Sequence, residues 1–302
     1  GPQATVGGFS DVEPGLFSSN IGGGNVSAFG VVSDAFIGQA FGVAVSIPLY
    51  RALQAAQGIS ESASAFDPAS APSLTKGQVA SILQDGGAVV NADSWAPILG
   101  DDPGQKVIIQ RRVDTSGTQA SSNVFFLGSP CTGSAALAPA ADNSGNYLVF
   151  KQASTGGVKT GITNASNSAD TTARFAIGVL SMENDWRAEN AANGGYRFIK
   201  IDGVHPETGD VANARLSAAA GTYPFHMEMK AFVATSAPAG FQKTIVPTIV
   251  NALKNPIASA CATLPRGLTL NPAGGNTTCQ AGVVKAKFTN LGNNCSPATL
   301  LE

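Results

Sequence analysis

The chain has 302 residues, a net charge of −2 and only 13% charged residues. This length suffices for two lobes that each bury a core. The low charge excludes the broad basic surface by which proteins hold nucleic acid or an anionic membrane, so any anion site has to be local and preorganised.

Short apolar runs alternate with helix-length segments along the chain. The first strand is expected over residues 41–47, and a helix is expected over residues 48–57, where apolar residues recur at helical spacing. A second helix is expected over residues 73–83, with a Ser or Thr cap at its start and Gly86-Gly87 after its end.

The alternation continues in the middle of the chain. Strands are expected over residues 107–110, 175–180 and 198–201, and residues 124–127 are expected to close a helix. Surface loops are expected where turn-forming residues dominate, over residues 67–72, 138–146 and 155–171. Strands that alternate with helices predict an α/β fold.

Four cysteines are present, and Cys261, Cys279 and Cys295 are close together near the end of the chain. No Cys-x-x-Cys motif occurs and neither histidine is near a cysteine, which favours disulfides over a zinc site. The spacing leaves three pairings open. Bridges between Cys279 and Cys295 or between Cys261 and Cys279 close the shortest loops, while Cys131 either pairs with this tail or lies buried alone.

The most specific motif is the stretch from Arg111 to Thr118, which follows an apolar run and precedes a helical segment. A strand brings a guanidinium to its end, and Ser116-Gly117-Thr118 open a helix whose free backbone N–H groups face the same point. This pattern predicts a site for a small tetrahedral anion. Arg111 is expected to point the other way and to be solvated. The rival interpretation of Arg112 and Asp114 is a structural ion pair at a strand end.

Several segments, taken together and in this order, resemble the periplasmic phosphate-binding proteins of ABC phosphate transporters, over roughly residues 8 to 250. These are Phe9-Ser10-Asp11, residues 41–45, residues 74–95, residues 111–118, residues 176–181 and residues 221–225. The resemblance implies a two-lobed, type II periplasmic-binding-protein-like α/β fold, in which each lobe is a mixed sheet flanked by helices. Lobe I would hold residues 1–42 and 222–302 and lobe II residues 43–221, with a hinge near Val43 and Tyr223.

The resemblance also implies a ligand set. Its members are Asp11, Arg112, Asp114, Ser116, Gly117 and Thr118. Arg112 would pair with the anion and Asp114 would hold Arg112 through a second ion pair. Asp11 would accept a hydrogen bond from a protonated phosphate oxygen, which disfavours sulfate because sulfate has no proton to donate. The rival interpretation makes Asp11 a turn cap before Pro14.

One departure from the family concerns the start of the chain. Family members have strand and helix segments before the residue that matches Asp11, whereas ten residues precede it here. Gly22-Gly23-Gly24 is a poor substitute for the loops of that segment. We expect that the segment was cleaved or left out, that another polypeptide supplies it and completes lobe I, or that lobe I is rebuilt without it.

The function implied is that of a non-enzymatic binding protein for phosphate or a similar oxyanion. Such a protein would be periplasmic, secreted or at the cell surface, would use no cofactor or metal, and would deliver its ligand to an ABC transporter permease. The alternative is a secreted or surface structural protein that pairs its depleted lobe with a partner strand or another copy.

The remaining polar residues favour structural roles. His205 and His226 lack a Ser or Cys partner pattern, which favours core or surface positions over catalysis. A mixed polar cluster after the strand at residues 175–180 is expected to be a solvated loop; it comprises Glu183, Asp185, Trp186 and Arg187.

Overall fold

The computed structural model describes residues 6–17, 26–60, 68–132, 136–188, 195–274 and 278–301. Gly22-Gly23-Gly24 and residue 67 of the first expected loop lie outside this part of the chain. The strands are β1 (Gly7–Ser10), β2 (Gly30–Ser46), β3 (Ser73–Leu74), β4 (Val107–Arg112), β5 (Tyr147–Gln152), β6 (Ala176–Ser181), β7 (Tyr196–Phe198), β8 (Lys200–Ile201), β9 (His226–Ala234), β10 (Leu268–Leu270), β11 (Phe288–Thr289) and β12 (Thr299–Leu300).

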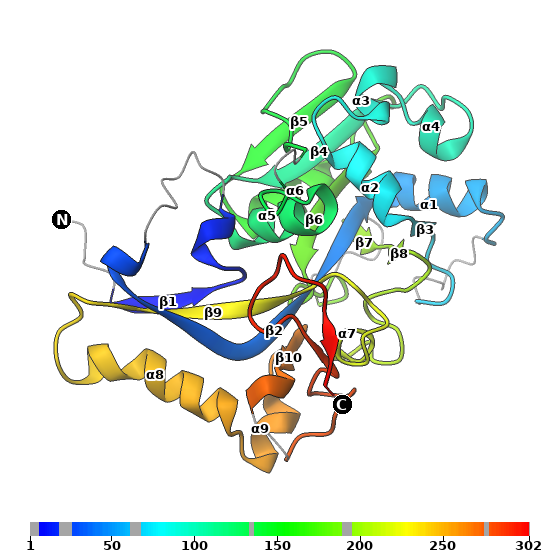
Figure 1. Cartoon of the computed structure of the whole chain (residues 1–302). Coiled ribbons are helices and arrows are strands. Elements are labelled where there is room, and N and C mark those ends of the chain that lie inside the picture. Colours follow the sequence, from blue (N-terminus) through cyan, green and yellow to red (C-terminus); the bar gives the residue numbers. More distant parts are fainter. Residues whose placement is uncertain are drawn as a thin grey trace.

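Helices lie between and around these strands (Figure 1). The α-helices are α1 (Ile47–Ala56), α2 (Lys76–Leu83), α3 (Ala88–Ala92), α4 (Ala96–Leu99), α5 (Gly117–Ser122), α6 (Thr155–Ser166), α7 (Leu216–Ala219), α8 (Phe241–Lys254) and α9 (Ala258–Thr263). The π-helix η4 (Asn123–Leu127) continues α5, and short 3-10 turns occur at η1 (Pro14–Leu16), η3 (Val26–Ala28) and η5 (Pro272–Gly274). Among the described residues, no helix is both long enough and apolar enough to cross a membrane.

The main sheet is mixed and has the strand order β1-β9-β2-β6-β4-β5, while β10 and β7 also pair with β2. Strand β4 is parallel to β5 and β6, and β2 is antiparallel to β9 and β6. Along its first half β2 pairs with β9, and along its second half it pairs with β6. A mixed sheet with helices around it confirms the predicted α/β class.

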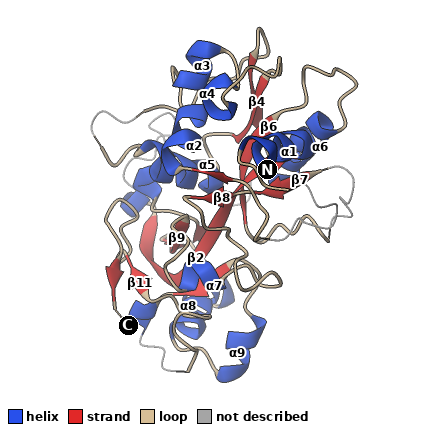
Figure 2. Ribbon diagram, turned by 90° about the vertical axis from the view of Figure 1, so that its right-hand side faces the viewer, coloured by secondary structure: helices blue, strands red, loops and turns tan. Residues whose placement is uncertain are grey.

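Two lobes share strand β2 (Figure 2). We call the part built on β1, β9, β10 and the first half of β2 the first lobe, and the part built on β4, β5, β6 and the second half of β2 the second lobe. Every residue from Gly38 to Ser46 of β2 is buried, as the continuous apolar run predicts for a strand covered on both faces. The boundaries at residues 42 and 222 stay a prediction.

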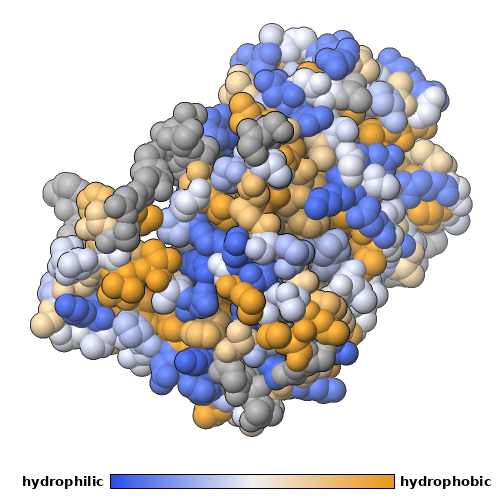
Figure 3. All heavy atoms as spheres, viewed as in Figure 1, coloured by the Kyte–Doolittle hydropathy of each residue, from blue (hydrophilic) through white to orange (hydrophobic). Residues whose placement is uncertain are grey.

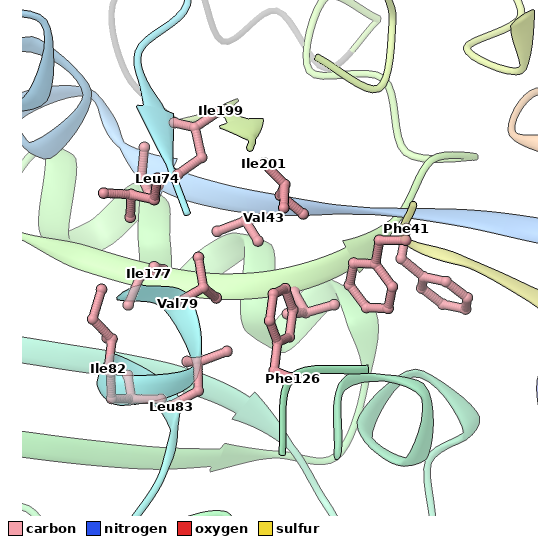
Figure 4. Packing of buried hydrophobic residues seen from close by; sticks show 14 of the residues in the cluster. Phe41, Val43, Leu74, Val79, Ile82, Leu83, Phe126, Ile177, Ile199 and Ile201 are labelled. Atoms are coloured by element: carbon pink, nitrogen blue, oxygen red, sulfur yellow. The ribbon is translucent and has the colours of Figure 1, made fainter. Parts of the chain in front are cut away.

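The strands expected over residues 107–110 and 175–180 and both expected helices are confirmed, with shifts at their ends. The strand expected over residues 198–201 is instead divided between β7, which pairs with β2, and β8, which pairs with β3, and residues 73–74 form β3 ahead of α2. The helix predicted after the first strand is α1, and α2 begins at a capping box, in which Thr75 and Gln78 satisfy each other's backbone N–H groups. Figure 4 shows Val79 of α2 beside Val43 of β2 in this core, with Ile82 in the same buried cluster. All three side chains are completely buried.

The loop predicted over residues 155–171 is wrong for most of its length, because residues 155–166 form α6. Gly, Ser, Thr and Asn dominate this segment and have low intrinsic helix propensity. Ser154 caps the helix by accepting a hydrogen bond from the backbone N–H of Gly157, and Val158 and Ile162 are buried one turn apart. A good cap and tertiary packing therefore outweigh propensity here.

The predicted preference for disulfides is confirmed, and Cys131, for which two alternatives were left open, is paired as well. Cys261 pairs with Cys279, which is one of the two short loops considered, and Cys131 pairs with Cys295. The second bridge joins the segment after η4 in the second lobe to the tail, by which we mean residues 278–301. A disulfide therefore connects the two lobes in addition to strand β2.

Candidate functional site

The backbone of the stretch from Arg111 to Thr118 has the strand–turn–helix course that its sequence predicts. Strand β4 ends at Arg112, a turn follows, and α5 begins at Gly117 with Ser116 as its extended N-cap residue. The backbone N–H of Ser116 donates to the carbonyl of Val113 and closes the turn. Ser116 and Thr118 are both buried. The free N–H groups at the start of α5 thus lie next to the end of β4.

Arg112 is half-buried and held by the second lobe. Its Nη1 donates to Oγ1 of Thr155 over 2.8 Å, and its Nη2 donates to the carbonyl of Ala153 over 3.2 Å. Its Nε is buried without a hydrogen-bond partner in the described part of the chain. Burial lowers the pKa of Arg112, and the nearby Asp11 opposes that shift. The guanidinium is therefore fixed in orientation and still has an unused donor.

The predicted partner of Asp114 is wrong. Asp114 pairs with Arg111 through Oδ1 and with Lys151 through Oδ2, the latter over 2.8 Å. Burial opposes ionisation of Asp114, but Lys151 and Arg111 outweigh it and lower the pKa of its carboxyl overall. The resemblance implied a pair between Arg112 and Asp114. Strand alternation would place these two side chains on one side, but β4 ends at Arg112 and the alternation ends with it.

Arg111 points away from Arg112, as expected, but it is buried rather than solvated. Its Nη1 donates to the carbonyl of Pro139 over 2.6 Å, in addition to the pair with Asp114. The Arg111–Asp114–Lys151 group is therefore a structural ion network at the end of β4, close to the rival interpretation of the motif. Asp114 therefore fixes the turn through Arg111 and Lys151 rather than holding Arg112.

Asp11 lies directly against the start of α5. A Cβ atom built at Gly117 would lie 2.5 Å from Oδ2 of Asp11, so any larger residue at this position would displace that carboxylate. Neither oxygen of Asp11 accepts a hydrogen bond from a described residue. Burial and the negative charge of Glu183 raise the pKa of Asp11 from 3.8 to about 6, against the attraction of Arg112. Asp11, Arg112 and Gly117 are thus brought together from both lobes.

Sequence reasoning missed two groups near Arg112. Thr155 accepts a hydrogen bond from Arg112 at the first residue of α6, so a second helix N-terminus lies beside the guanidinium. Glu183 is exposed and close enough to Asp11 to raise its pKa. The signal for Thr155 was present in Ser154-Thr155-Gly156-Gly157, which repeats the Ser, Gly and Thr composition of the start of α5.

We expect Asp11→Asn to stabilise the free protein at about pH 8 and to be neutral at about pH 4. The raised pKa means that the folded state holds the Asp11 proton more tightly than the unfolded state, so its stabilising contribution is complete below the unfolded pKa of 3.8 and is lost as the pH rises through about 6. The asparagine resembles the protonated acid, and its advantage at high pH is at most about 3 kcal/mol. Urea unfolding across this pH range measures it.

The control for this prediction is Asp101→Asn, which removes one carboxylate from an exposed loop. This variant reports the general effect of a changed net charge. A variant Asp11→Asn that is less stable than the natural protein at both ends of the pH range would show that the carboxylate stabilises the fold as a cap, which is the rival interpretation.

The histidines have structural surroundings, as predicted. His205 is buried, with Nε2 3.1 Å from the carbonyl of Phe198 and Nδ1 accepting from the backbone of Glu207. Nε2 of His226 lies 2.7 Å from Oγ1 of Thr269. In the described part of the chain, no group of three or more His, Cys, Asp and Glu side chains is placed to hold a metal ion.

The expected solvated loop at residues 183–187 is wrong for part of its length. Arg187 forms two 3.0 Å bonds with the carboxylate of Glu207, which is completely buried. Trp186 is half-buried, with the guanidinium of Arg197 3.6 Å from its ring centroid. Glu183 alone of this cluster is exposed. Aromatic and ion-pair contacts with distant residues hold the segment in place, and these contacts leave no local sequence pattern.

Comparisons with known proteins find similarity in structure rather than in sequence. A scan against protein-family models finds no match, and a search of curated proteins finds none either. Among solved structures, the chain is similar to an ABC-type phosphate transport receptor from Vibrio cholerae, with 15% identity and a TM-score of 0.41 over 73% of this chain and 66% of the receptor. It is also similar to PstS from Borrelia burgdorferi, with 11% identity and a TM-score of 0.38 over 75% of this chain and 68% of that protein.

The chain spans about two thirds of the length of these solved structures. They belong to the class of protein that the sequence resemblance indicates. The TM-scores show only a low similarity in the course of the backbone. The functional conclusion therefore rests on the residues around Asp11 and Arg112.

Proposed function

We propose that the protein binds phosphate, or a similar protonated tetrahedral oxyanion, between Asp11 of the first lobe and Arg112 of the second. The observation that carries this proposal is the carboxylate of Asp11, which lies beside Gly117 at the start of α5 without a hydrogen bond from any described residue. Such an arrangement destabilises the free protein at neutral pH. Groups that cost stability in this way are typical of binding and catalytic sites.

A bound phosphate ion would give the Asp11 carboxylate the hydrogen-bond donor that it lacks in the described part of the chain. Asp11 and a phosphate oxygen would share one proton, while the unused Nε donor of Arg112 and the first N–H groups of α5 would meet the remaining oxygens. Asp114 would keep Arg111 and the turn fixed behind the site. Sulfate has no proton to share at neutral pH, so its oxygen would face the Asp11 carboxylate directly.

The setting of the protein belongs to the same proposal. We place the lobe boundaries near residues 42 and 222, and we place the protein outside the cytoplasm, where the two disulfides persist. A non-enzymatic binding protein in this setting would hand its ligand to an ABC transporter permease. A polypeptide segment that completes the first lobe would add further anion ligands.

The test is isothermal titration of phosphate, with sulfate as the control anion, into the natural chain and into Arg112→Gln. Loss of a charge-assisted hydrogen bond costs about 1.5 to 3 kcal/mol, so the variant should bind phosphate roughly 10- to 100-fold more weakly. Asp11→Asn should narrow the preference for phosphate over sulfate.

Two further variants make this test specific. Lys243→Gln removes a positive charge from the exposed side of α8 and should bind phosphate like the natural chain. Gly117→Ala keeps all charges but places a methyl group against Asp11, and it should also weaken binding. Equal affinity of the natural chain and Arg112→Gln, with both folded, would reject the site.

A second candidate function rests on strand β1. This strand lies at the end of the described sheet and pairs with β9 along one side only. A free edge is a template for a strand from another chain or another copy. Absence of phosphate binding together with self-association in solution would favour this structural role over the binding role.

A further inference from the structure

A cavity of about 580 Å³ lies between the two lobes, and its lining includes none of the residues of the proposed phosphate site. Its walls come from α2 and η4 of the second lobe, from the start of β9 in the first lobe, and from the tail. Figure 1 shows the tail, in red, crossing in front of β9 and β2 towards α5. On the same face, Figure 3 shows hydrophilic residues gathered in the middle of the molecule. A volume of this size suits an organic molecule rather than a bare oxyanion.

The tail wall of the cavity is anchored at three points. The carboxylate of Glu228 accepts hydrogen bonds from the backbone N–H groups of Asn290, over 3.2 Å, and Gly292, over 2.8 Å. The side chain of Asn294 donates to the carboxylate of Glu13 over 2.7 Å. The next residue, Cys295, is bonded to Cys131 on the opposite wall. The cavity is therefore preformed, and a ligand would not have to order its walls.

A fixed cation lies on the second-lobe wall. Nζ of Lys76 lies 4.3 Å from the centre of the Phe125 ring, and Phe125 stacks on Phe225 at 4.5 Å with an interplanar angle of 9°. The Lys76 side chain is exposed, and its ammonium has no hydrogen bond or ion pair with a described residue. The stacked rings thus contact the ammonium group. The carboxylate of Asp202 is nearby, where it accepts a hydrogen bond from the backbone N–H of Lys76 over 3.0 Å and opposes the lowering of the Lys76 pKa by burial, and it forms no ion pair with the ammonium itself.

Lys76 is the positively charged residue of the cavity lining. Burial lowers the pKa of His226 to about 4, so its ring is neutral at physiological pH. Burial raises the pKa of Glu228, whose carboxylate already accepts two backbone hydrogen bonds from the tail. Oδ1 of Asn290 is buried without a donor in the described part of the chain. Much of the remaining lining is apolar and includes Pro224 and Phe288.

We propose that this cavity binds a small organic anion, with its acid group at Lys76 and an aromatic or branched apolar part against Pro224 and Phe288. The fixed ammonium sets the charge of the ligand, and the volume and apolar lining set its organic character. The site shares no residue with the proposed phosphate site and does not depend on it.

The probe for this site is anilinonaphthalene sulfonate, an aromatic monoanion whose fluorescence rises in apolar surroundings, with neutral phenylnaphthylamine as its uncharged counterpart. We expect the oxidised natural chain to bind one molecule of the anion per chain. Lys76→Gln should weaken this binding about tenfold. Thr132→Trp, a substitution at an exposed lining residue, should weaken both probes by filling the cavity. Lys243→Gln, the same change on exposed α8, should have no effect.

Each other result overturns the proposal. Equal affinity of the natural chain and Lys76→Gln for the anion, or equal binding of the anionic and neutral probes, would show that Lys76 does not select the ligand. Loss of probe binding in Arg112→Gln, or displacement of the probe by phosphate, would place the probe at the phosphate site instead. Binding of several probe molecules per chain, unchanged in Thr132→Trp, would indicate scattered apolar surface.

Discussion

The double variant Cys131→Ser with Cys295→Ser should lose up to about 5 kcal/mol of its free energy of unfolding. The disulfide closes a loop with a sequence separation of 164 residues, and it restricts the unfolded chain far more than a short loop does. Loop-closure entropy grows with the logarithm of loop length, which gives the upper bound quoted. Urea unfolding of the oxidised protein and of the variant measures the difference.

The matched control is Cys261→Ser with Cys279→Ser, because this pair closes a loop with a sequence separation of only 18 residues. The same entropy argument gives about 3 kcal/mol for it. A smaller loss from the long loop than from the short one would contradict the prediction. It would mean that the tail and the second lobe are held together in the unfolded state by other means.

Glu207→Ala should destabilise the protein by about 3 to 5 kcal/mol. The Glu207 side chain is completely buried, and it pairs with Arg187 through two 3.0 Å hydrogen bonds and with Arg266 through a third. Removing the carboxylate leaves Arg187 and Arg266 with only their longer contacts to Asp185, of 3.6 and 4.0 Å, and the Arg266 side chain is only 12% exposed. The measurement is the midpoint and slope of urea unfolding.

Lys106→Met is the comparison for Glu207→Ala. It breaks the ion pair between Lys106 and Asp170, whose side chains are 30% and 49% exposed, and should change stability by less than about 1 kcal/mol. Similar losses in the two variants would show that burial of Glu207 does not set its contribution. Phosphate binding should be the same in Lys106→Met as in the natural chain.

Much of the fold could be predicted because single segments carry clear local signals. The buried half of β2 and strands β4 and β6 are continuous apolar runs, and α2 has a capping box. Helix α6 was not predicted, because its residues favour loops and only its cap and its packing make it a helix. Pairing of β1 with β9 and the course of the tail depend on contacts between distant residues, which one sequence does not reveal.

In the candidate site, too, the features with a local sequence signal were predicted and those that depend on distant contacts were not. The start of α5, the position of Arg112 and the presence of Asp11 beside Gly117 agree with expectation, and their role as anion ligands stays a prediction. The predicted partner of Asp114, implied by the resemblance, was wrong: β4 ends at Arg112, and Asp114 in the turn that follows pairs with Arg111. Thr155 was missed together with α6, since a helix N-terminus has no meaning until the helix itself is recognised.

Besides β2, side-chain hydrogen bonds and a disulfide connect the two lobes. Arg266, just before β10, donates to the carbonyls of Met182 and Asn184 in the second lobe, and the cystine joins the tail to the segment after η4. A binding protein that opens and closes loses affinity in proportion to the time it spends open. These contacts and the cystine would oppose an equilibrium between open and closed lobes. The rate of ligand exchange would then be set by side chains at the entrance, and reduction of the cystine would change that rate.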